Sequence, residues 1–241
     1  MQLQNALKVL FPGQCAACGT LVEDAHALCG ACWVDTAFID GLSCDACGLP
    51  MIGEAAGARP LCDACLNTPP LWHQGRAVFM YTGQGRRMVL ALKHGDRVEI
   101  AKPAARWMAA RLSVLLPTGG ALVPVPLHWT RLVARRFNQA ALLANGIGSI
   151  TGHDVIVDAL VRRRRTGSQE NRSRDERFGN LSGAMVAHPS RAKQIVGRRI
   201  VVVDDVLTSG ATLTEATRAL LDAGAASVSV LVLARVAKAP W

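Results

Sequence analysis

The stretch IVVVDDVLTSGAT, residues 200–212, decides the expected fold of this chain. The β-branched apolar residues at 200–203, with Val206 after them, predict a strand buried on both faces, as at the centre of a parallel sheet. Asp204 and Asp205 stand at the carboxyl end of this strand, the edge at which open α/β sheets bind ligands. The small residues at 208–212 then predict a turn into a helix over residues 213–223, ended by Gly224. We therefore expect an α/β domain.

The same stretch also predicts a ligand site. Backbone N–H groups at a helix N-terminus bind anions, and the nearby hydroxyls of Thr208, Ser209 and Thr212 add further hydrogen-bond donors. The two carboxylates suit a pair of vicinal hydroxyls, or a Mg²⁺ ion held through water. A phosphate beside a diol describes a ribose 5-phosphate. The alternative is a core strand that ends in two surface acids before a capped helix.

This stretch resembles the PRPP-binding signature of the type I phosphoribosyltransferases, in which four apolar residues, two acids and two further residues precede T-[ST]-G-[AG]-T. The resemblance implies a type I phosphoribosyltransferase-like parallel sheet and catalytic roles for Asp204 and Asp205. It also implies that PRPP binds with Mg²⁺ and that its phosphate contacts Thr208, Ser209, Gly210, Ala211 and Thr212.

Composition and charge set the outer limits. The chain has 241 residues, of which 50% are apolar and 19% charged, which is typical of a globular protein. No apolar run of about 18 residues occurs, so no membrane span is expected. The N-terminus lacks an export leader, which favours a cytoplasmic protein. Residues 1–70 carry two basic and seven acidic side chains, and residues 71–241 carry 25 basic and 11 acidic ones. The basic part suits a polyphosphate or a nucleic acid equally.

The cysteines form a separate module. All eight lie in four C-x-A-C pairs: Cys15 and Cys18, Cys29 and Cys32, Cys44 and Cys47, Cys62 and Cys65. Such pairs bind zinc, and Gly19 and Gly48 are expected to aim backbone N–H groups at the sulfur atoms. A disulfide framework is disfavoured in a chain without an export leader. The repeat CAACG…CGAC and CDACG…CDAC favours two sequential four-cysteine sites over an interleaved pairing.

The two zinc ions are expected to be structural, because four thiolates leave no open coordination position. His26 lies in the first loop and is a substitute ligand only if a cysteine does not bind. The breaker NTPP at 67–70 divides the chain into a double zinc ribbon, residues 1–70, and a phosphoribosyltransferase-like domain, residues 71–241.

Further elements follow in order along the second part. Apolar patterning predicts an extended segment over 72–81, helices over 86–93 and 98–116, a strand over 121–125, a helix over 131–146, and strands over 155–161 and 227–234. The loop after the strand at 121–125 falls where phosphoribosyltransferases hold pyrophosphate. The resemblance therefore implies phosphate contacts from residues 126–130, with Pro126, Leu127 and His128 foremost. His128 and Trp129 are bulkier than such a loop usually allows.

Two basic segments flank this loop in the sequence. Arg131 and Arg135 share one expected helix face, which is either a solvated basic surface or a track for phosphates. Phe137, Asn138 and Gln139 follow, and either read a base or pack the helix onto the sheet. Residues 162–185 are charged and poor in apolar side chains, so they predict a mobile loop that is either a lid over the ligand or a surface loop.

Nearly the whole chain resembles the ComF family, also called ComF/GntX. The resemblance rests on the cysteine pairs, residues 81–86, KHGD at 93–96, VPVPLHWTRLVARRFNQ at 123–139, the stretch at 200–212, and a loop pattern of Leu160, Arg162, Arg164, Thr166, Gln169, Arg177, Asn180 and Gly183. It implies phosphate-binding roles for Arg131, Arg162, Arg164 and Gln169. One departure is Arg136, where the family usually has glycine.

The family resemblance leaves two functions open. In the first, the protein binds PRPP or a related phosphate group and handles incoming single-stranded DNA in natural transformation, together with DNA-uptake proteins. In the second, it is a Mg²⁺-dependent phosphoribosyltransferase that transfers ribose 5-phosphate from PRPP to an unknown acceptor. A steep loss of affinity with salt distinguishes DNA backbone binding.

Overall fold

The computed structural model describes residues 12–24, 27–53, 59–94, 97–116, 119–127, 137–163 and 183–237. Its elements in chain order are α2 (Gly30–Val34), α3 (Asp63–Asn67), β1 (Gly75–Met80), α4 (Gly83–Lys93), η1 (Val98–Ile100), α5 (Ala101–Leu115), β2 (Ala121–Pro124), α7 (Gln139–Thr151), β3 (Asp154–Val155), β4 (Leu160–Arg162), β5 (Met185–Ala187), η2 (Pro189–Arg191), α9 (Ala192–Ile195), β6 (Arg199–Leu207), α10 (Ala211–Asp222) and β7 (Ser227–Arg235). None of the helices in these ranges is long and apolar enough to cross a bilayer.

A five-stranded sheet forms the centre of the molecule, in the order β1-β7-β6-β2-β3. Every neighbouring pair in this sheet is parallel. The strand predicted from residues 200–203 is the middle strand, β6, and all four residues are buried. The expected α/β fold with a parallel sheet is therefore confirmed.

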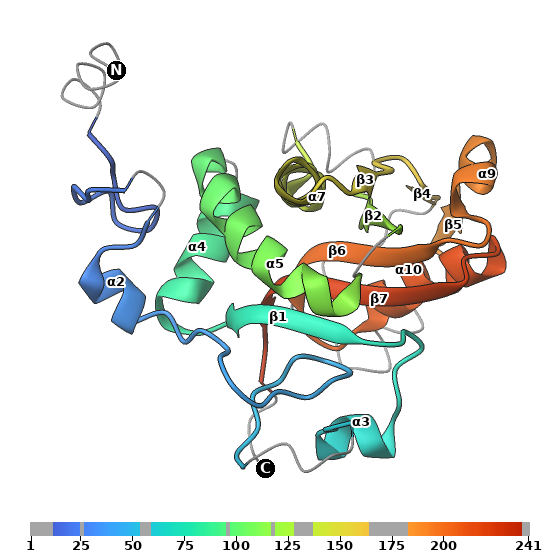
Figure 1. Cartoon of the computed structure of the whole chain (residues 1–241), viewed down its shortest axis with the longest axis horizontal. Coiled ribbons are helices and arrows are strands. Elements are labelled where there is room, and N and C mark those ends of the chain that lie inside the picture. Colours follow the sequence, from blue (N-terminus) through green and yellow to red (C-terminus); the bar gives the residue numbers. More distant parts are fainter. Residues whose placement is uncertain are drawn as a thin grey trace.

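The alternation of side chains along β6 separates the core into two layers. Val201 and Val203 belong to the apolar cluster formed with α4, α5 and α7. Ile200 and Val202 belong to the cluster formed with α10 on the opposite face. Figure 1 shows α5 and α7 above the sheet, and α3 below it. A strand with both faces covered explains the unbroken apolar run in the sequence.

The predicted strand over 155–161 is wrong, because the segment forms two short strands. Residues 154–155 add to the edge of the main sheet beside β2. After a turn, residues 160–162 pair with β5 in a separate antiparallel ribbon, which the apolar patterning did not predict. The exposed Val157 and Asp158 form that turn, and they interrupt the apolar run.

The predicted end of the helix over 131–146 is also wrong. Residues 128–136 lie outside the described part, and α7 runs on through Gly146 to Thr151 before Gly152 ends it at φ 75°. Position 146 needs a glycine because a Cβ there would lie only 2.6 Å from that of Ala105 in α5. This glycine permits close packing of two helices and does not terminate one.

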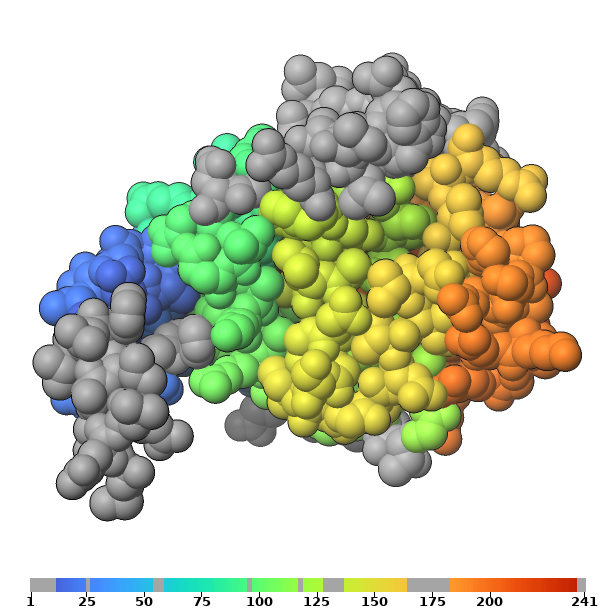
Figure 2. All heavy atoms as spheres, turned by 90° about the horizontal axis from the view of Figure 1, so that it is seen from above, coloured from blue at the N-terminus to red at the C-terminus, as the bar shows by residue number. Residues whose placement is uncertain are grey.

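The part of the chain before residue 71 contributes to the core of the sheet. Ile39 N–H donates to the Val78 carbonyl, and Met80 N–H donates to the Ala37 carbonyl, so residues 37–39 lie along β1. Cys44 and Cys47 are buried in the same apolar cluster as the strand residues facing α10. The earlier residues, 12–34, lie at one end of the molecule beside α4 and α5, away from α9 (Figure 2). The two cysteine groups thus occupy different environments.

Candidate functional site

Two adjacent acids lie near the carboxyl end of the central strand. Asp205 is buried and Asp204 is half-buried. The Asp205 N–H donates to Oδ1 of Asp204 at 2.9 Å. At the end of α4, Lys93 places its Nζ 3.6 Å from Oδ1 of Asp205. This lysine lies in the KHGD segment, but its pairing with Asp205 is set by the tertiary structure.

The electrostatics of this pair are unusual for surface carboxylates. Burial, together with the charge of Asp205, raises the pKa of Asp204 to about 7. The Asp205 N–H and the positive charges of Lys93 and Arg162 act in the opposite direction. Arg162, at the end of β4, is thus close enough to influence Asp204. A cation or a set of hydroxyl donors placed here would relieve the repulsion between the two carboxyl groups.

The loop that follows has the form of an anion site. Gly210 is the N-cap of the 12-residue helix α10, with φ 84°, and no side chain caps this helix end. The first N–H groups of a helix have no partner within the helix, so they are available to an anion. Thr208 is exposed, Ser209 and Thr212 are half-buried, and Ala211 is buried. The predicted phosphate loop therefore stands directly after the paired acids.

The loop after β2 is only partly described. Pro126 and Leu127 are half-buried, whereas His128 and Arg131 lie outside the described residues. The start of the loop is anchored by Asn138, whose Nδ2 donates to the Val125 carbonyl at 3.0 Å.

The amides of the FNQ segment are both bonded to backbone. Asn138 also caps α7, because its side-chain oxygen accepts from the Ala140 N–H. The buried Gln139 donates to the Lys93 carbonyl at 3.4 Å. Of the two alternatives for this segment, the structure favours packing of the helix onto the sheet over base recognition.

The charged segment after β4 is described only at its ends. Arg164 and Gln169 lie outside the described residues, as does the rest of 164–182. At its far end, the Gly183 N–H donates to the buried Glu215 of α10 at 2.8 Å. Arg218 forms an ion pair with the same carboxylate. Glu215 was not predicted, although an acid among the apolar residues of α10 is a signal that sequence inspection can find.

The eight sulfur atoms form two clusters in the sequential arrangement that the repeat favoured. The first cluster contains Cys15, Cys18, Cys29 and Cys32, the second contains Cys44, Cys47, Cys62 and Cys65, and the sulfur atoms of each lie within 4.8 Å of one another. The Cys18–Cys29 and Cys47–Cys62 sulfur distances are 3.7 Å and 3.8 Å. Tetrahedral zinc with Zn–S bonds of about 2.3 Å requires sulfur atoms about 3.8 Å apart. The residues therefore fit zinc.

The chemistry of the donors agrees with this geometry. A hydrogen bond with Cys47 lowers the pKa of Cys44 to about 4, and hydrogen bonds with Thr20 lower the pKa of Cys18 to about 6. Each cluster thus contains a thiol whose pKa is lowered toward the thiolate that binds metal, whereas burial raises the pKa of Cys32 and Cys65. His26 lies outside the described residues.

The expected role of Gly19 and Gly48 needs correction; each follows a C-x-A-C pair, and the turn that such a pair forms is called a knuckle. The N–H groups of Gly19 and Gly48 donate to the Cys15 and Cys44 carbonyl oxygens, not to sulfur. Other N–H groups donate to sulfur: Cys29 N–H donates to Cys15 Sγ at 3.2 Å, and Cys62 N–H to Cys44 Sγ at 3.3 Å. Both glycines instead have positive φ, 79° and 69°, which closes the turn.

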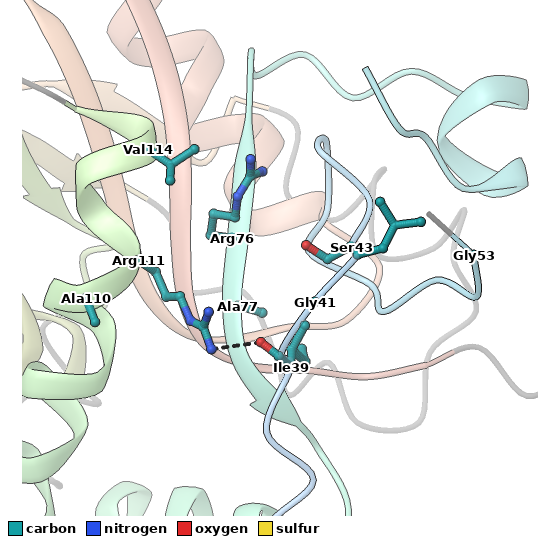
Figure 3. A pocket seen from close by; sticks show the side chains of 10 residues that line it. Ile39, Gly41, Ser43, Gly53, Arg76, Ala77, Ala110, Arg111 and Val114 are labelled. Atoms are coloured by element: carbon teal, nitrogen blue, oxygen red, sulfur yellow. Dashed lines mark hydrogen bonds between the residues drawn. The ribbon is translucent and has the colours of Figure 1, made fainter. Parts of the chain in front are cut away.

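A cavity of about 520 Å³ lies elsewhere, between α5, β1 and residues 39–43 (Figure 3). None of the residues predicted to bind a ligand lines it. Its two arginines are both engaged: Arg111 donates to the Ile39 carbonyl at 2.8 Å, and Arg76 donates to Asp45 at 2.6 Å. This cavity is therefore not the site of the predicted chemistry.

The parallel sheet, the acids before the Gly210 turn and the two four-cysteine sites define a phosphoribosyltransferase-like protein with a double zinc ribbon. Two family models agree: the double zinc ribbon domain matches residues 6–66, and the phosphoribosyl transferase domain matches residues 138–240. The chain belongs to the ComF family, and it has two four-cysteine zinc-binding sites.

Curated relatives match over nearly the full length. DNA utilization protein YhgH of Salmonella typhi is 35% identical over 232 residues, covering 93% of this chain and 97% of the relative. Competence protein ComFC of Bacillus subtilis is 29% identical, with 89% and 87% covered. Competence protein F of Haemophilus influenzae is 27% identical, with 93% and 98% covered. The solved structure of the allosteric regulatory enzyme of purine biosynthesis matches 60% of this chain and 30% of its own, at 19% identity and a TM-score of 0.39.

Proposed function

We propose that this protein binds PRPP with Mg²⁺, or a closely related phosphoribosyl group, and that it uses this site in handling single-stranded DNA. The observation that carries the proposal is the pairing of Asp205 with Lys93, next to Asp204 and five residues before an uncapped helix N-terminus. Hydroxyls of the ribose would bind to the carboxylates, and the 5-phosphate would bind to the N–H groups of residues 208–212.

The energetics of the acid pair support a ligand-binding role. Burial of Asp204 and the charge of the neighbouring Asp205 disfavour the ionised form of Asp204, so this arrangement destabilises the unliganded protein. A scaffold has no physical need for this arrangement, whereas a Mg²⁺ ion and a sugar diol would use both groups. Arg162, whose charge acts on Asp204, would face the phosphates of the same ligand. Arg131, Arg164 and Gln169 are proposed to contribute further phosphate contacts on the strength of the family pattern alone.

The DNA-handling part of the proposal rests on the relatives, which are named for competence and DNA utilization. The excess of basic side chains after residue 70 agrees with a nucleic-acid partner. DNA-uptake proteins are the expected protein partners, and the site of action would be the cytoplasm.

The second candidate function is a Mg²⁺-dependent phosphoribosyltransferase. The intact acid pair and phosphate loop favour it, because these are the groups that hold the ribose of PRPP while pyrophosphate leaves. In this case Asp204 and Asp205 would be catalytic, and the loop at 126–130 would receive the pyrophosphate. We favour binding over turnover, because His128 and Trp129 are bulky residues for a pyrophosphate loop.

Calorimetry with PRPP and Mg²⁺ tests the binding site. Replacing a charged hydrogen-bond acceptor costs about 1.5–3 kcal/mol, so Asp205→Asn is expected to weaken binding by about tenfold or more. The matched control is Asp222→Asn, an exposed carboxylate at the other end of α10, which is expected to bind as the wild type does. No binding heat for the wild type, or equal affinity for Asp205→Asn, would refute the site.

Two further assays separate the candidate functions. Fluorescence anisotropy with a single-stranded oligonucleotide is expected to show an affinity that falls steeply between about 50 and 200 mM salt. Incubation of the protein with PRPP and a panel of bases and amines tests for pyrophosphate release. Release above the no-acceptor control with one acceptor would select the transferase, and salt-sensitive DNA binding without release would select the DNA-handling protein.

A further inference from the structure

The second cysteine cluster and the phosphate loop are joined by one tryptophan. Trp72 Nε1 donates to the carbonyl of Ala46, within the Cys44–Cys47 knuckle, at 2.6 Å. The other end of the same ring covers Gly210, where an added Cβ would lie 3.0 Å from the ring carbon. Trp72 is buried, so both contacts are shielded from water. A displacement of the knuckle would therefore be passed to the N-cap of α10.

A buried arginine makes a second connection between the same two regions. Arg235 ends β7, and its Nη1 donates to the carbonyl oxygens of Leu207 and Thr208 at 3.1 Å and 3.2 Å. These bonds hold the first peptide of the phosphate loop. The same side chain lines a cavity that Cys47 and Cys65 of the second cluster also line.

The second cluster and the loop also share a cavity. A cavity of about 310 Å³ has Cys47 and Cys65 in one wall and residues 208–210 in another, and both side chains line it. Nε of Arg235 is buried and has no hydrogen-bond partner among the described residues. Both side chains therefore lie where the second cluster and the loop face each other.

The first cysteine cluster has no such relation to the loop among the described contacts. Cys18 is exposed, and Cys29 is half-buried. Its knuckle is instead held by Arg97, which donates to the carbonyls of Ala16 and Ala17 at 3.2 Å and 3.4 Å. The segment lies at the end of the molecule (Figure 2). Among the described contacts, only the second cluster is therefore linked to the loop at 208–210.

We propose that Trp72 and Arg235 are positioning residues that couple the metal-loaded second cluster to the phosphate loop, and that the first cluster is not coupled to it. A metal bound by all four sulfur atoms ties the 44–47 pair to the 62–65 pair, and loss of the metal removes this constraint from the turn that carries Ala46. Trp72 and Arg235 then keep Gly210 and the Leu207 and Thr208 carbonyls in place. The coupling gives the loop its function only if the proposed phosphate binding is correct.

Hydrogen exchange of the peptide spanning 208–214 tests the coupling without any ligand. Trp72→Phe removes the donor to Ala46 but keeps an aromatic ring, and Arg235→Lys keeps the charge but removes the planar fork. One hydrogen bond contributes about 0.5–1.5 kcal/mol, so exchange of this peptide is expected to rise by about two- to tenfold in Trp72→Phe. Arg235→Lys is expected to raise it at least as much. Both variants should retain two zinc ions by elemental analysis.

The matched control is Trp33→Phe, which changes an exposed tryptophan next to the first cluster. It is expected to leave exchange at 208–214 unchanged. Selective loss of metal from the second cluster, in Cys65→Ser, should increase exchange at the loop, and loss from the first, in Cys18→Ser, should not. If Cys65→Ser does not fold, Trp72→Phe and Arg235→Lys still test the coupling. Unchanged exchange in both of those variants, or an equal rise in Trp33→Phe, would overturn the proposal.

The affinity for PRPP separates this proposal from the function on which it depends. A wild-type protein that fails to bind PRPP refutes the proposed function, while the exchange experiment still tests the coupling. If the wild type binds, Trp72→Phe is expected to bind about two- to tenfold more weakly, and Trp33→Phe to bind equally well. Equal affinity in Trp72→Phe and the wild type would count against the coupling alone.

Discussion

Nζ of Lys93 lies 3.6 Å from Oδ1 of Asp205, which brings the end of α4 to the end of the central strand. Lys93 is 112 positions from Asp205 in the chain, so only the fold creates this pair. The ammonium stabilises the charged form of Asp204, and burial opposes it, so that the pKa of Asp204 is raised. The ionisation of the site in the absence of ligand is therefore a balance that single substitutions can shift.

Lys93→Met is expected to raise the pKa of Asp204 above its wild-type value. The reason is that the positive charge of Lys93 favours the ionised form of Asp204 and so lowers its pKa. Carboxyl ¹³C chemical shifts followed over pH measure the change directly. Lys193→Met, which removes an exposed cation from α9, is the control and is expected to have no effect. A pKa that stays the same in Lys93→Met would contradict the role assigned to this lysine.

The stability of the unliganded protein is expected to fall as pH rises toward neutrality because of Asp204. Its pKa is raised from 3.8 to about 7, so the folded state binds more protons than the unfolded state between these values. Stability from this group is thus largest at low pH and is lost as pH rises through about 7, at roughly 1.4 kcal/mol per unit at most. Because Asp204 is only half-buried, the observed loss should be smaller.

Asp204→Asn provides the comparison for this prediction, because it resembles the protonated carboxyl group at every pH. Other groups titrate in the same range, so the useful quantity is the difference in Tm between the variant and the wild type, measured from pH 5 to 8. That difference should grow in favour of the variant as pH rises. A difference independent of pH would show that Asp204 titrates normally.

Gly48→Ala is expected to destabilise the zinc-loaded protein more than Gly19→Ala does. Both glycines have positive φ, which costs a side-chain-bearing residue about 1–2 kcal/mol. Only at Gly48 would the new Cβ also meet backbone, 2.7 Å from the Ala77 nitrogen, whereas no atom lies within 4 Å at Gly19. The clash should add about 1–3 kcal/mol. Urea unfolding of both variants measures this, and equal losses would contradict the packing of the second cluster on β1.

Gly146→Ala is expected to destabilise the protein, although alanine favours a helix over glycine by about 1 kcal/mol. The added Cβ would lie 2.6 Å from Cβ of Ala105, and overpacking of this kind costs about 1–3 kcal/mol. Ala105→Gly should relieve the contact, so the double variant is expected to be more stable than the sum of the single changes predicts. Additive free energies of unfolding in this cycle would show that α5 and α7 move apart at little cost.

The local pattern of residues was enough to predict the central strand, the turn and the helix at 200–222. The apolar run, the two acids and the glycine turn each depend on residues that are adjacent in the chain, so the sequence shows them directly. The two metal sites were also predictable from local sequence, because the two-residue spacing within each cysteine pair lets both thiols bind one ion. The boundaries at 146 and 155–161 were mispredicted, because Gly146 serves a contact with another helix and residues 154–162 divide between two sheets.

The tertiary structure alone decided which distant side chains meet the predicted site. Lys93 pairs with Asp205, Glu215 accepts from the Gly183 N–H, Trp72 contacts Ala46 and Gly210, and Arg235 donates to the Leu207 and Thr208 carbonyls. None of these contacts leaves a periodic or spaced signal, because each depends on how parallel strands and their covering helices bring remote parts of the chain to one edge of the sheet. The sequence by itself determined the chemistry of the loop and of the metal ligands. Packing determined that the two zinc sites are not equivalent.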